Sequence, residues 1–296
     1  MSRFAGSRRL RLGWLAYLVV IAGGVTMVLP FLDMVMSSFK GPDEYGLLPY
    51  HLLPKNFDLE NYRLAFSQLD LGRLFANSVI VTVSVTLLVL ITSSMAGYAL
   101  AKLRFRGRSV LFRFILATMM LPPFLLLIPD FMIMLNWPLV GGNNLLGRGG
   151  DGGMTTSIVS LILPFAVNGF GIFLVRQFMI GIPDELLEAA RIDGAGEFQL
   201  WLRIILPQIR PVATTLALIT FVGQWNEYIW TLLISSANPD LMTLPVGVQL
   251  LQGFLDPNRT MPIVMAGLVI STIPVLVVFL AFQRYYVRGI VMSGMK

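Results

Sequence analysis

Six apolar stretches, each long enough to cross a membrane, constrain this chain more than any other feature of its sequence. The hydrocarbon core of a bilayer is about 30 Å thick, and about 20 residues of α-helix cross it. Only 13% of the 296 residues are charged, against about 25% in an ordinary soluble domain. The sequence therefore predicts an all-α polytopic membrane protein that forms a single domain over residues 1–296. Its six transmembrane helices are expected at residues 12–36, 75–100, 110–135, 157–178, 212–234 and 261–282.

Lysine and arginine are distributed unevenly between the linkers that join these stretches. Placing the N-terminus in the cytoplasm puts 16 of the 22 Lys and Arg residues on the cytoplasmic side and 6 on the other. Cytoplasmic loops of membrane proteins carry such an excess. Both termini are therefore predicted to be cytoplasmic, and a polar segment at about 180–211 becomes a cytoplasmic loop. The net charge of +6 follows from this distribution and does not indicate nucleic acid as a partner.

The first stretch has an alternative interpretation, because arginines precede it as they do in a secretory signal peptide. Its apolar run exceeds the 7–15 residues typical of a signal peptide, and no Ala-x-Ala site follows it. We therefore expect a retained span. The chain has no cysteine and a single histidine, His51, which is expected to be an ordinary exposed side chain. No catalytic residue and no metal site are predicted.

The cytoplasmic loop contains the polar segment "EAARIDGAGEFQLWLRIILP" at residues 188–207. Pro183 suits the first turn of a helix, and Asp184 and Glu185 complement the positive end of its dipole. We expect a helix from there to about Asp193, where "DGAG" predicts a turn.

A second helix is expected from about Glu197 until Pro207 and Pro211 end or kink it. Its spacing predicts one apolar face, which an exposed helix usually presents to a protein partner. The residues of this face are Phe198, Trp201, Leu202 and Ile205.

The loop resembles the EAA signature of the membrane subunits of binding-protein-dependent ABC importers. It carries all seven fixed positions at the right spacing: Glu188, Ala189, Ala190, Gly194, Ile204, Leu206 and Pro207. The resemblance implies the ABC importer permease fold, in which this EAA loop (residues 180–211) is a coupling-helix region seated in a cleft of an ATPase subunit. These residues, with Asp193, are then expected to couple the chain to that ATPase, and the glycine to supply the sharp turn.

The chain has no pattern for ATP hydrolysis. A phosphate-binding loop typically ends in Gly-Lys followed by Ser or Thr, and none of the four lysines follows a glycine. The carboxylates form no acid–base pair in the sequence. The chain is therefore predicted to be a non-catalytic transport subunit without a cofactor of its own. The resemblance implies that ATP and Mg are bound by partner ATPase subunits.

The fifth stretch contains Glu227, the one carboxylate near the middle of any span. An ionisable group inside a membrane is costly and therefore indicates function. In a continuous helix, Thr220, Gln224, Glu227 and Thr231 would form one polar stripe. Amides, a carboxylate and aromatic rings suit a sugar, so the substrate path is expected at Gln224, Trp225, Asn226, Glu227 and Tyr228. Alternatively, these polar groups only bond to neighbouring helices.

The element "WNE" at 225–227 and the C-terminal "QRYYVRGIVMSGMK" resemble the carbohydrate branch of this importer family, in particular its smaller permease subunit of the maltose-transporter type. The resemblance implies half of a permease heterodimer in a prokaryotic inner membrane that imports a sugar or sugar-like solute by alternating access. The implied partners are a second permease subunit, two ATPase subunits and an extracytoplasmic solute-binding protein. Asp130, in "LIPDFMIM", departs from the apolar residue expected there.

Two outer segments are also informative. The segment "GGNNLLGRGGDGG" at 141–153 is expected to be a flexible external loop. In the segment at 239–260, Pro245 and Gly247 are expected to break regular structure. That segment resembles the external loop that reaches toward a docked binding protein; alternatively it is a re-entrant packing segment.

A different class of function is an ion-driven secondary transporter with Glu227 as its ion or proton site. Such transporters often carry internal repeats, and none is found in this sequence. A purely structural membrane anchor would leave the polar residues of the fifth stretch unexplained.

Overall fold

The computed structural model describes residues 5–46, 48–68, 70–251 and 257–293. Within these ranges the chain is helical and has no strand, so the predicted all-α class is confirmed. The chain divides into two compact units, one of Met1–Asp70 with Val248–Thr272 and one of Leu71–Gly247 with Ile273–Lys296. Each unit is described by itself. Arg3 and Lys296, which contribute to the predicted charge asymmetry, lie outside the described residues.

The first unit begins with α1 (Ala5–Ser37), the first of the predicted spans. A connecting segment then leads to α2 (Glu60–Gln68). Asn61, at the start of α2, is buried, and its side-chain amide donates to the carbonyls of Ser38 and Lys40 at 2.9 and 2.8 Å. These bonds hold the connection between the two helices in one conformation. The last helix, α14 (Pro257–Ser293), begins in this unit and continues into the second.

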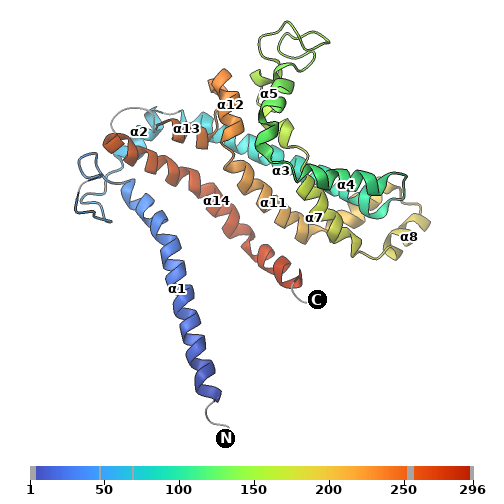
Figure 1. Cartoon of the computed structure of the whole chain (residues 1–296), viewed down its shortest axis with the longest axis horizontal. Helices are drawn as coiled ribbons and strands as arrows, with labels where there is room; N and C mark the ends of the chain where they lie inside the picture. The colour runs from blue at the N-terminus through green and yellow to red at the C-terminus, as the bar shows by residue number, and fades with distance from the viewer. Residues whose placement is uncertain (1–4, 47, 69, 252–256, 294–296) are drawn as a thin grey trace. The chain divides into compact units, whose positions relative to one another are not determined.

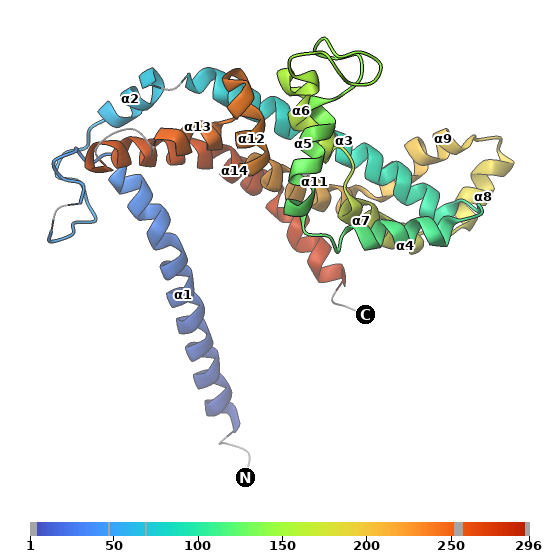
Figure 2. The ribbon, with the colours of Figure 1, turned by 45° about the horizontal axis from the view of Figure 1, so that its top comes forward.

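The second unit is built on α3 (Leu71–Lys102), which packs against α7 (Gly169–Ile180) and α11 (Arg210–Trp225). Figures 1 and 2 show α7 running alongside the second half of α3. Glycines allow this close approach. A Cβ atom on Gly97 would lie 3.1 Å from Val175 Cγ1 and 3.2 Å from the Arg176 backbone nitrogen, and one on Gly171 would collide with Ser93 Oγ. Small residues at a helix contact let backbones approach closely inside a membrane.

Two predicted spans are bent helix pairs instead of continuous helices. The third consists of α4 (Arg108–Thr118) followed by η1 (Pro123–Leu126) and α5 (Leu127–Leu135), bent by 95°. The fourth consists of α6 (Val159–Ile162) with η3 (Leu163–Phe165), followed by α7 and bent by 44°.

The sequence explains where both bends occur. Pro122 and Pro123 lie at the first bend; proline has no N–H and restricts the residue before it, so helices usually end there. At the second bend Asn168 starts a new helix, because its side-chain oxygen accepts the Gly171 N–H at 2.9 Å as an N-cap.

The fifth predicted span is wrong as a continuous helix over 212–234. The helix α11 ends at Trp225 and α12 begins at Ile229 and runs to Ala237. A different pair, Glu197–Gln208 and Arg210–Trp225, is apolar enough to span a membrane together and is bent by 80°. By length and composition, the described residues therefore contain three long membrane-crossing helices, or up to six spans if each bent pair is one.

The glycine-rich segment at 141–153 is held by hydrogen bonds, which differs from the flexible loop expected. Asn143 is buried, and its amide donates to the carbonyls of Leu135 and Trp137 at 3.0 and 3.1 Å. Its side-chain oxygen accepts the Gly150 N–H at 3.0 Å. The adjacent residues Asn143 and Asn144 were the sequence feature that could have predicted this ordered loop, since Asn side chains readily form hydrogen bonds with nearby backbone groups.

The segment after α12 packs against the first turns of α3. It consists of η5 (Pro239–Leu241) and α13 (Leu244–Leu250), so the predicted break at Pro245 and Gly247 is wrong. Asn77 donates to the carbonyls of Asp240 and Met242 at 2.8 and 2.9 Å. Within this unit, residues 239–247 thus pack against α3.

The contact between α3 and α7 leads to a stability prediction. Gly97→Leu places a side chain against the α7 backbone and is expected to destabilise the protein by about 1–3 kcal/mol through overpacking. Gly223→Leu in α11 is the matched control, because no atom lies within 4 Å of a Cβ there and glycine inside a helix costs about 1 kcal/mol. Thermal unfolding in detergent should rank Gly97→Leu below the wild type and Gly223→Leu at or above it. The reverse order would contradict the proposed packing.

Candidate functional site

The EAA loop folds into the two helices predicted from its sequence. The first, α8 (Glu185–Ile192), follows Pro183 and has Glu185 and Glu188 in its first turn. The second part begins at Glu197 as α9 (Glu197–Leu200) and continues through the π-helical segment η4 (Trp201–Ile205) into α10 (Leu206–Gln208). It bends by 80° into α11. The predicted kink between Pro207 and Pro211 is confirmed.

Gly194 makes the turn between the two helices. Its φ is +84°, in the left-handed region that costs a residue with a Cβ roughly 1–2 kcal/mol. The Gly194 N–H donates to the Arg191 carbonyl at 3.0 Å, and the Ala195 N–H donates to the Ala190 carbonyl at 3.0 Å. This pair of bonds is the Schellman motif, which ends a helix and satisfies its last carbonyls. The loop therefore needs glycine at this position because the backbone there has a positive φ.

The predicted apolar face of the second helix is split between the core and the surface. Trp201 and Ile205 are buried, with 8% and 0% of their areas exposed, whereas Phe198 and Leu202 are 64% and 46% exposed. The prediction of one exposed face is therefore wrong. The π-helical segment adds a residue to the turn and changes the α-helical register on which the prediction relied. Exposed large apolar side chains instead occur on both helices of the loop: Leu186, Ile192, Phe198 and Leu202.

The signature residues lie on this one loop, at different depths. Glu188, Ala189, Asp193, Gly194 and Pro207 are exposed. Ala190, Ile204 and Leu206 are half-buried and pack against the core of the unit. The structure thus separates residues that a partner could contact from residues that seat the loop on its own chain.

Two residues of α3 hold the loop and were missed from the sequence. The Lys102 ammonium donates to the Ile182 carbonyl and to Asp184 Oδ1, both at 2.5 Å. The Tyr98 hydroxyl bonds to Glu197 Oε2. Across the Gly194 turn, Arg191 forms an ion pair with Glu197 through two hydrogen bonds. The Nε–Oε1 distance is 2.9 Å and the Nη2–Oε2 distance is 3.3 Å. In the sequence, Lys102 is recognisable only as one of the Lys and Arg residues on the predicted cytoplasmic side.

These contacts shift the pKa values of ionisable groups in the loop. The Lys102 hydrogen bond and charge hold the pKa of the Asp184 carboxyl below its usual value. The hydrogen bonds that Arg191 donates to the Glu197 carboxylate raise the pKa of the Arg191 guanidinium. Both groups are therefore charged at neutral pH.

A groove of about 460 Å³ separates α8 from the end of α3. It is polar and is bordered by groups from both elements, which are Lys102, Leu103, Arg104, Asp184, Leu187, Glu188, Arg191 and Glu197. Glu188 of the EAA signature thus stands at its rim.

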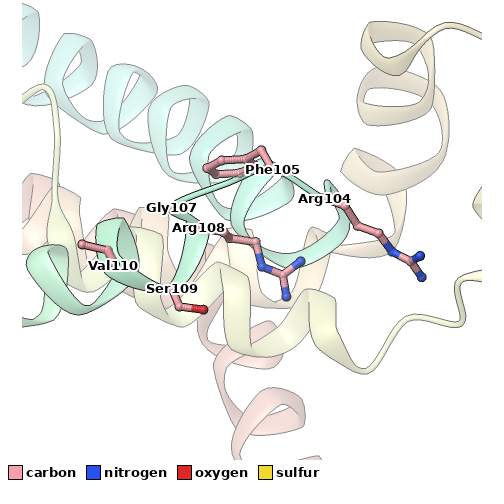
Figure 3. Close-up of a pocket in the computed structure, with 6 residues that line it drawn as sticks. All are labelled: Arg104, Phe105, Gly107, Arg108, Ser109 and Val110. Carbon is pink, nitrogen blue, oxygen red and sulfur yellow. The ribbon is translucent and has the colours of Figure 1, made fainter.

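A second hollow of about 480 Å³ lies at the turn between α3 and α4. Figure 3 shows Arg104 and Arg108 projecting from this turn, with their guanidinium groups apart instead of converging on one point. Arg108 Nη1 already donates to the Leu103 carbonyl at 3.0 Å. The turn therefore adds positive charge beside the EAA loop but offers no convergent pair of arginines for a single anion.

The predicted substrate-path residues lie at the break between α11 and α12. Glu227 is half-buried, and its carboxylate caps α12: Oε1 accepts the Trp230 N–H at 2.7 Å, and Oε2 accepts the Thr231 N–H at 3.0 Å and hydroxyl at 2.7 Å. Asn226 donates to the Val222 carbonyl at 2.8 Å. The prediction of one continuous polar stripe is wrong, because α11 ends at Trp225 and α12 begins at Ile229. These bonds place Asn226 at the end of α11 and Glu227 at the start of α12.

The aromatic residues of this segment differ in accessibility. Trp225 is buried, and its ring centroid lies 5.9 Å from those of Phe75 and Phe221. Gln224 and Tyr228 are half-buried. Trp225 is therefore a packing residue within this chain, whereas Asn226 is exposed. Asp130, which departs from the expected pattern, is half-buried in the first turn of α5.

Comparison with known proteins identifies the family. The sequence pattern of binding-protein-dependent transport system inner membrane components matches residues 89–292. The chain belongs to this family. The resemblance deduced from the EAA signature is thereby confirmed, and the chain is an inner membrane component of an ABC transporter.

Similar proteins extend the match over almost the whole chain. The arabinooligosaccharides transport system permease protein of Halalkalibacterium halodurans is 32% identical over 96% of this chain and 97% of its own. The diacetylchitobiose uptake system permease protein of Streptomyces coelicolor is 30% identical over 99% and 92%. A crystal structure of a bacterial ABC transporter that imports the acidic polysaccharide alginate matches with a TM-score of 0.78 at 23% identity, over 97% of this chain and 100% of the other. The last similarity establishes the fold of this permease family.

The position of Glu227 leads to a test of its role. Glu227→Gln keeps the shape of the side chain and weakens the charge-assisted bonds to α12, so thermal stability is expected to fall by about 1–2 kcal/mol. If the carboxylate only caps the helix, the KM for uptake by the assembled transporter stays unchanged. Loss of uptake at unchanged thermal stability would instead indicate a direct role in the solute or ion path.

The ion pair of Asp184 predicts a pH dependence in the loop. Since its folded pKa is depressed, its contribution is complete above the unfolded value of about 4 and is lost as the pH falls through the folded value. Hydrogen-exchange protection of α8, expressed relative to intrinsic exchange, should be constant from about pH 8 to 5 and decrease below about 4. In Asp184→Asn that step should be absent. An equal step in the variant would assign the effect to another group.

Proposed function

We propose that this chain is one half of the membrane permease of an ATP-driven importer for a sugar or sugar-like solute. The three long helices and three bent pairs supply up to six spans, and the Lys and Arg asymmetry supports cytoplasmic termini. The permeases similar to it are named for arabinooligosaccharides and diacetylchitobiose, which supports a carbohydrate. The solute would cross by alternating access between this chain and a second permease subunit.

The exposed surface of the EAA loop is the observation that carries this proposal. Leu186, Ile192, Phe198 and Leu202 are exposed on a loop whose Ala190, Ile204 and Leu206 pack against the core. Exposed apolar residues beside charged ones mark surfaces for protein partners. Glu188 and Gly194 lie on the same loop. We infer that this surface docks in a cleft of a separate ATPase subunit.

ATP hydrolysis belongs to those partner subunits in our proposal. None of the four lysines of the chain follows a glycine, so it lacks the lysine of a phosphate-binding loop. Two ATPase subunits would bind ATP and Mg, and a solute-binding protein would deliver the solute on the extracytoplasmic side. A related structure shows a bacterial alginate ABC transporter in complex with a periplasmic protein that carries an alginate pentasaccharide, which agrees with this composition.

The solute would pass the break between α11 and α12. Irregular backbone at membrane depth is tolerated where it lines an aqueous cavity or is covered by protein. Gln224 and Tyr228 are half-buried polar residues at that break. Among the described hydrogen bonds, those that cap the two helix ends come from Asn226 and Glu227 instead. Gln224 and Tyr228 would therefore meet the solute. Asn226 and Glu227 would hold the two helix ends in place, and the packed ring of Trp225 would support them from behind.

Two matched pairs of variants test the coupling. Glu188→Gln and Gly194→Ala are expected to reduce uptake at least tenfold while ATP hydrolysis by the reconstituted complex continues. The first removes the exposed charge at the groove, and the second strains the turn by about 1–2 kcal/mol. Glu185→Gln and Gly196→Ala are the controls, since Glu185 lies outside the signature and Gly196 has an ordinary φ of −75° with free space around a Cβ.

The outcome is measured as solute taken up per ATP hydrolysed in proteoliposomes. The proposal expects this ratio to fall in the two signature variants and to stay at the wild-type value in the two controls. Normal uptake by both Glu188→Gln and Gly194→Ala would refute the coupling role of the loop.

A further inference from the structure

Each helix of the EAA loop begins at a carboxylate that the last turn of α3 holds. Asp184 is the N-cap residue of α8, but its side chain makes no capping bond to that helix; it pairs with Lys102 instead, at 2.5 Å. Glu197 is the first residue of α9 and bonds to the Tyr98 hydroxyl. Tyr98 and Lys102 are four residues apart, so they lie on one face of α3. One helical turn of α3 thus contacts the starts of both α8 and α9.

Both α3 side chains are buried where they make these contacts. Tyr98 has 4% of its area exposed, and so does the Lys102 side chain. Burying an ammonium group is costly unless it is paired and hydrogen-bonded. Lys102 meets this condition with the Ile182 carbonyl and Asp184 together. Removing either α3 side chain would therefore remove one of the polar contacts between the loop and this helix.

The loop is also closed on itself. Arg191, in the last turn of α8, pairs with Glu197 by two hydrogen bonds across the Gly194 turn. Two-bond Arg–carboxylate pairs fix orientation as well as distance. Since Glu197 is bonded to Arg191 and Tyr98 at once, α8, the turn, α9 and the end of α3 form one connected set of contacts.

The opposite end of α3 is also attached through polar contacts. Asn77 donates to two carbonyls of residues 240–242, Ser78 Oγ accepts the Leu244 N–H at 2.8 Å, and Arg73 pairs with Asp240. With 32 residues, α3 is about 48 Å long. It joins the EAA loop at one end to the segment 239–247 at the other.

We propose that Tyr98 and Lys102 are positioning residues that fasten the EAA loop to α3, so that movement of the loop is passed to α3 as a rigid body. The inference rests on the proposed function, because it assumes that an ATPase subunit moves the loop. The inference adds that α3 is the helix to which the movement of the loop is passed. Without the two fastenings, less of the loop's movement would reach α3, and less solute would be transported for each ATP hydrolysed.

The first experiment compares Tyr98→Phe, Lys102→Met and the double variant in the reconstituted complex. Tyr98→Phe removes one hydroxyl and keeps the packing. ATP hydrolysis is expected to stay within about twofold of the wild type, and solute taken up per ATP is expected to fall at least fivefold in the double variant. Tyr17→Phe and Lys55→Met, on exposed side chains elsewhere, are the matched controls. An unchanged ratio in the double variant would overturn the inference.

The second experiment tests the fastening itself on the purified full-length chain, without partners. Hydrogen exchange of the amides at 185–200 is expected to quicken at least tenfold in Lys102→Met and in the double variant, while the amides of α7 stay protected. In Asp184→Asn/Lys102→Met the exchange should equal that of the single Lys102 variant, because both remove the same contact. Unchanged exchange in Lys102→Met would overturn the fastening.

The two experiments separate this inference from the proposed function. If the wild-type chain supports no ATP-driven uptake with its partners, the proposed function fails, and the exchange experiment still decides whether α3 holds the loop. If uptake is normal in the wild type and the ratio is unchanged in the variants, only the role of Tyr98 and Lys102 fails.

Discussion

The close approach of α3 and α7 is the contact on which the larger unit of this protein depends. Between helices in lipid there is no hydrophobic driving force, so packing at close range has to supply the attraction. Gly97 and Gly171 allow this close packing because they have no Cβ atom to collide with neighbouring residues. Because α7 leads directly into the EAA loop and α3 ends beside it, this contact also fixes where the loop emerges. The groove between α8 and α3 and the bonds of Tyr98 and Lys102 follow from that placement.

The sequence predicted the features that depend on local chemistry. Long apolar runs predicted the helices, and the Asp-Gly pair at 193–194 predicted the turn that Gly194 makes with its positive φ. The sequence did not predict features that depend on contacts between distant residues. A bonded partner such as Glu197 for Tyr98, 99 residues away, leaves no periodic signal. The break after Trp225 was missed because polar residues in an apolar run resemble a stripe on a continuous helix, whereas Asn226 and Glu227 cap two separate helix ends.

The exposed surfaces explain why such a chain works within an assembly. The most apolar 18-residue window of α1 has no buried side chain, and the two helices of the EAA loop expose Leu186, Ile192, Phe198 and Leu202. In a membrane, lipid or a second permease can cover the first surface, whereas the second lies among charged groups that belong in water. In the proposed function, these two environments separate a membrane-embedded path from a cytoplasmic docking surface.

Purification of the tagged chain from native membranes in a mild detergent, with ATP hydrolysis measured on what is recovered, tests the central claim most directly. Our account predicts that a second permease and an ATPase with a phosphate-binding loop co-purify with this chain. It also predicts that a solute-loaded binding protein stimulates the hydrolysis. A chain that purifies alone and moves solute along an ion gradient after reconstitution would contradict the account.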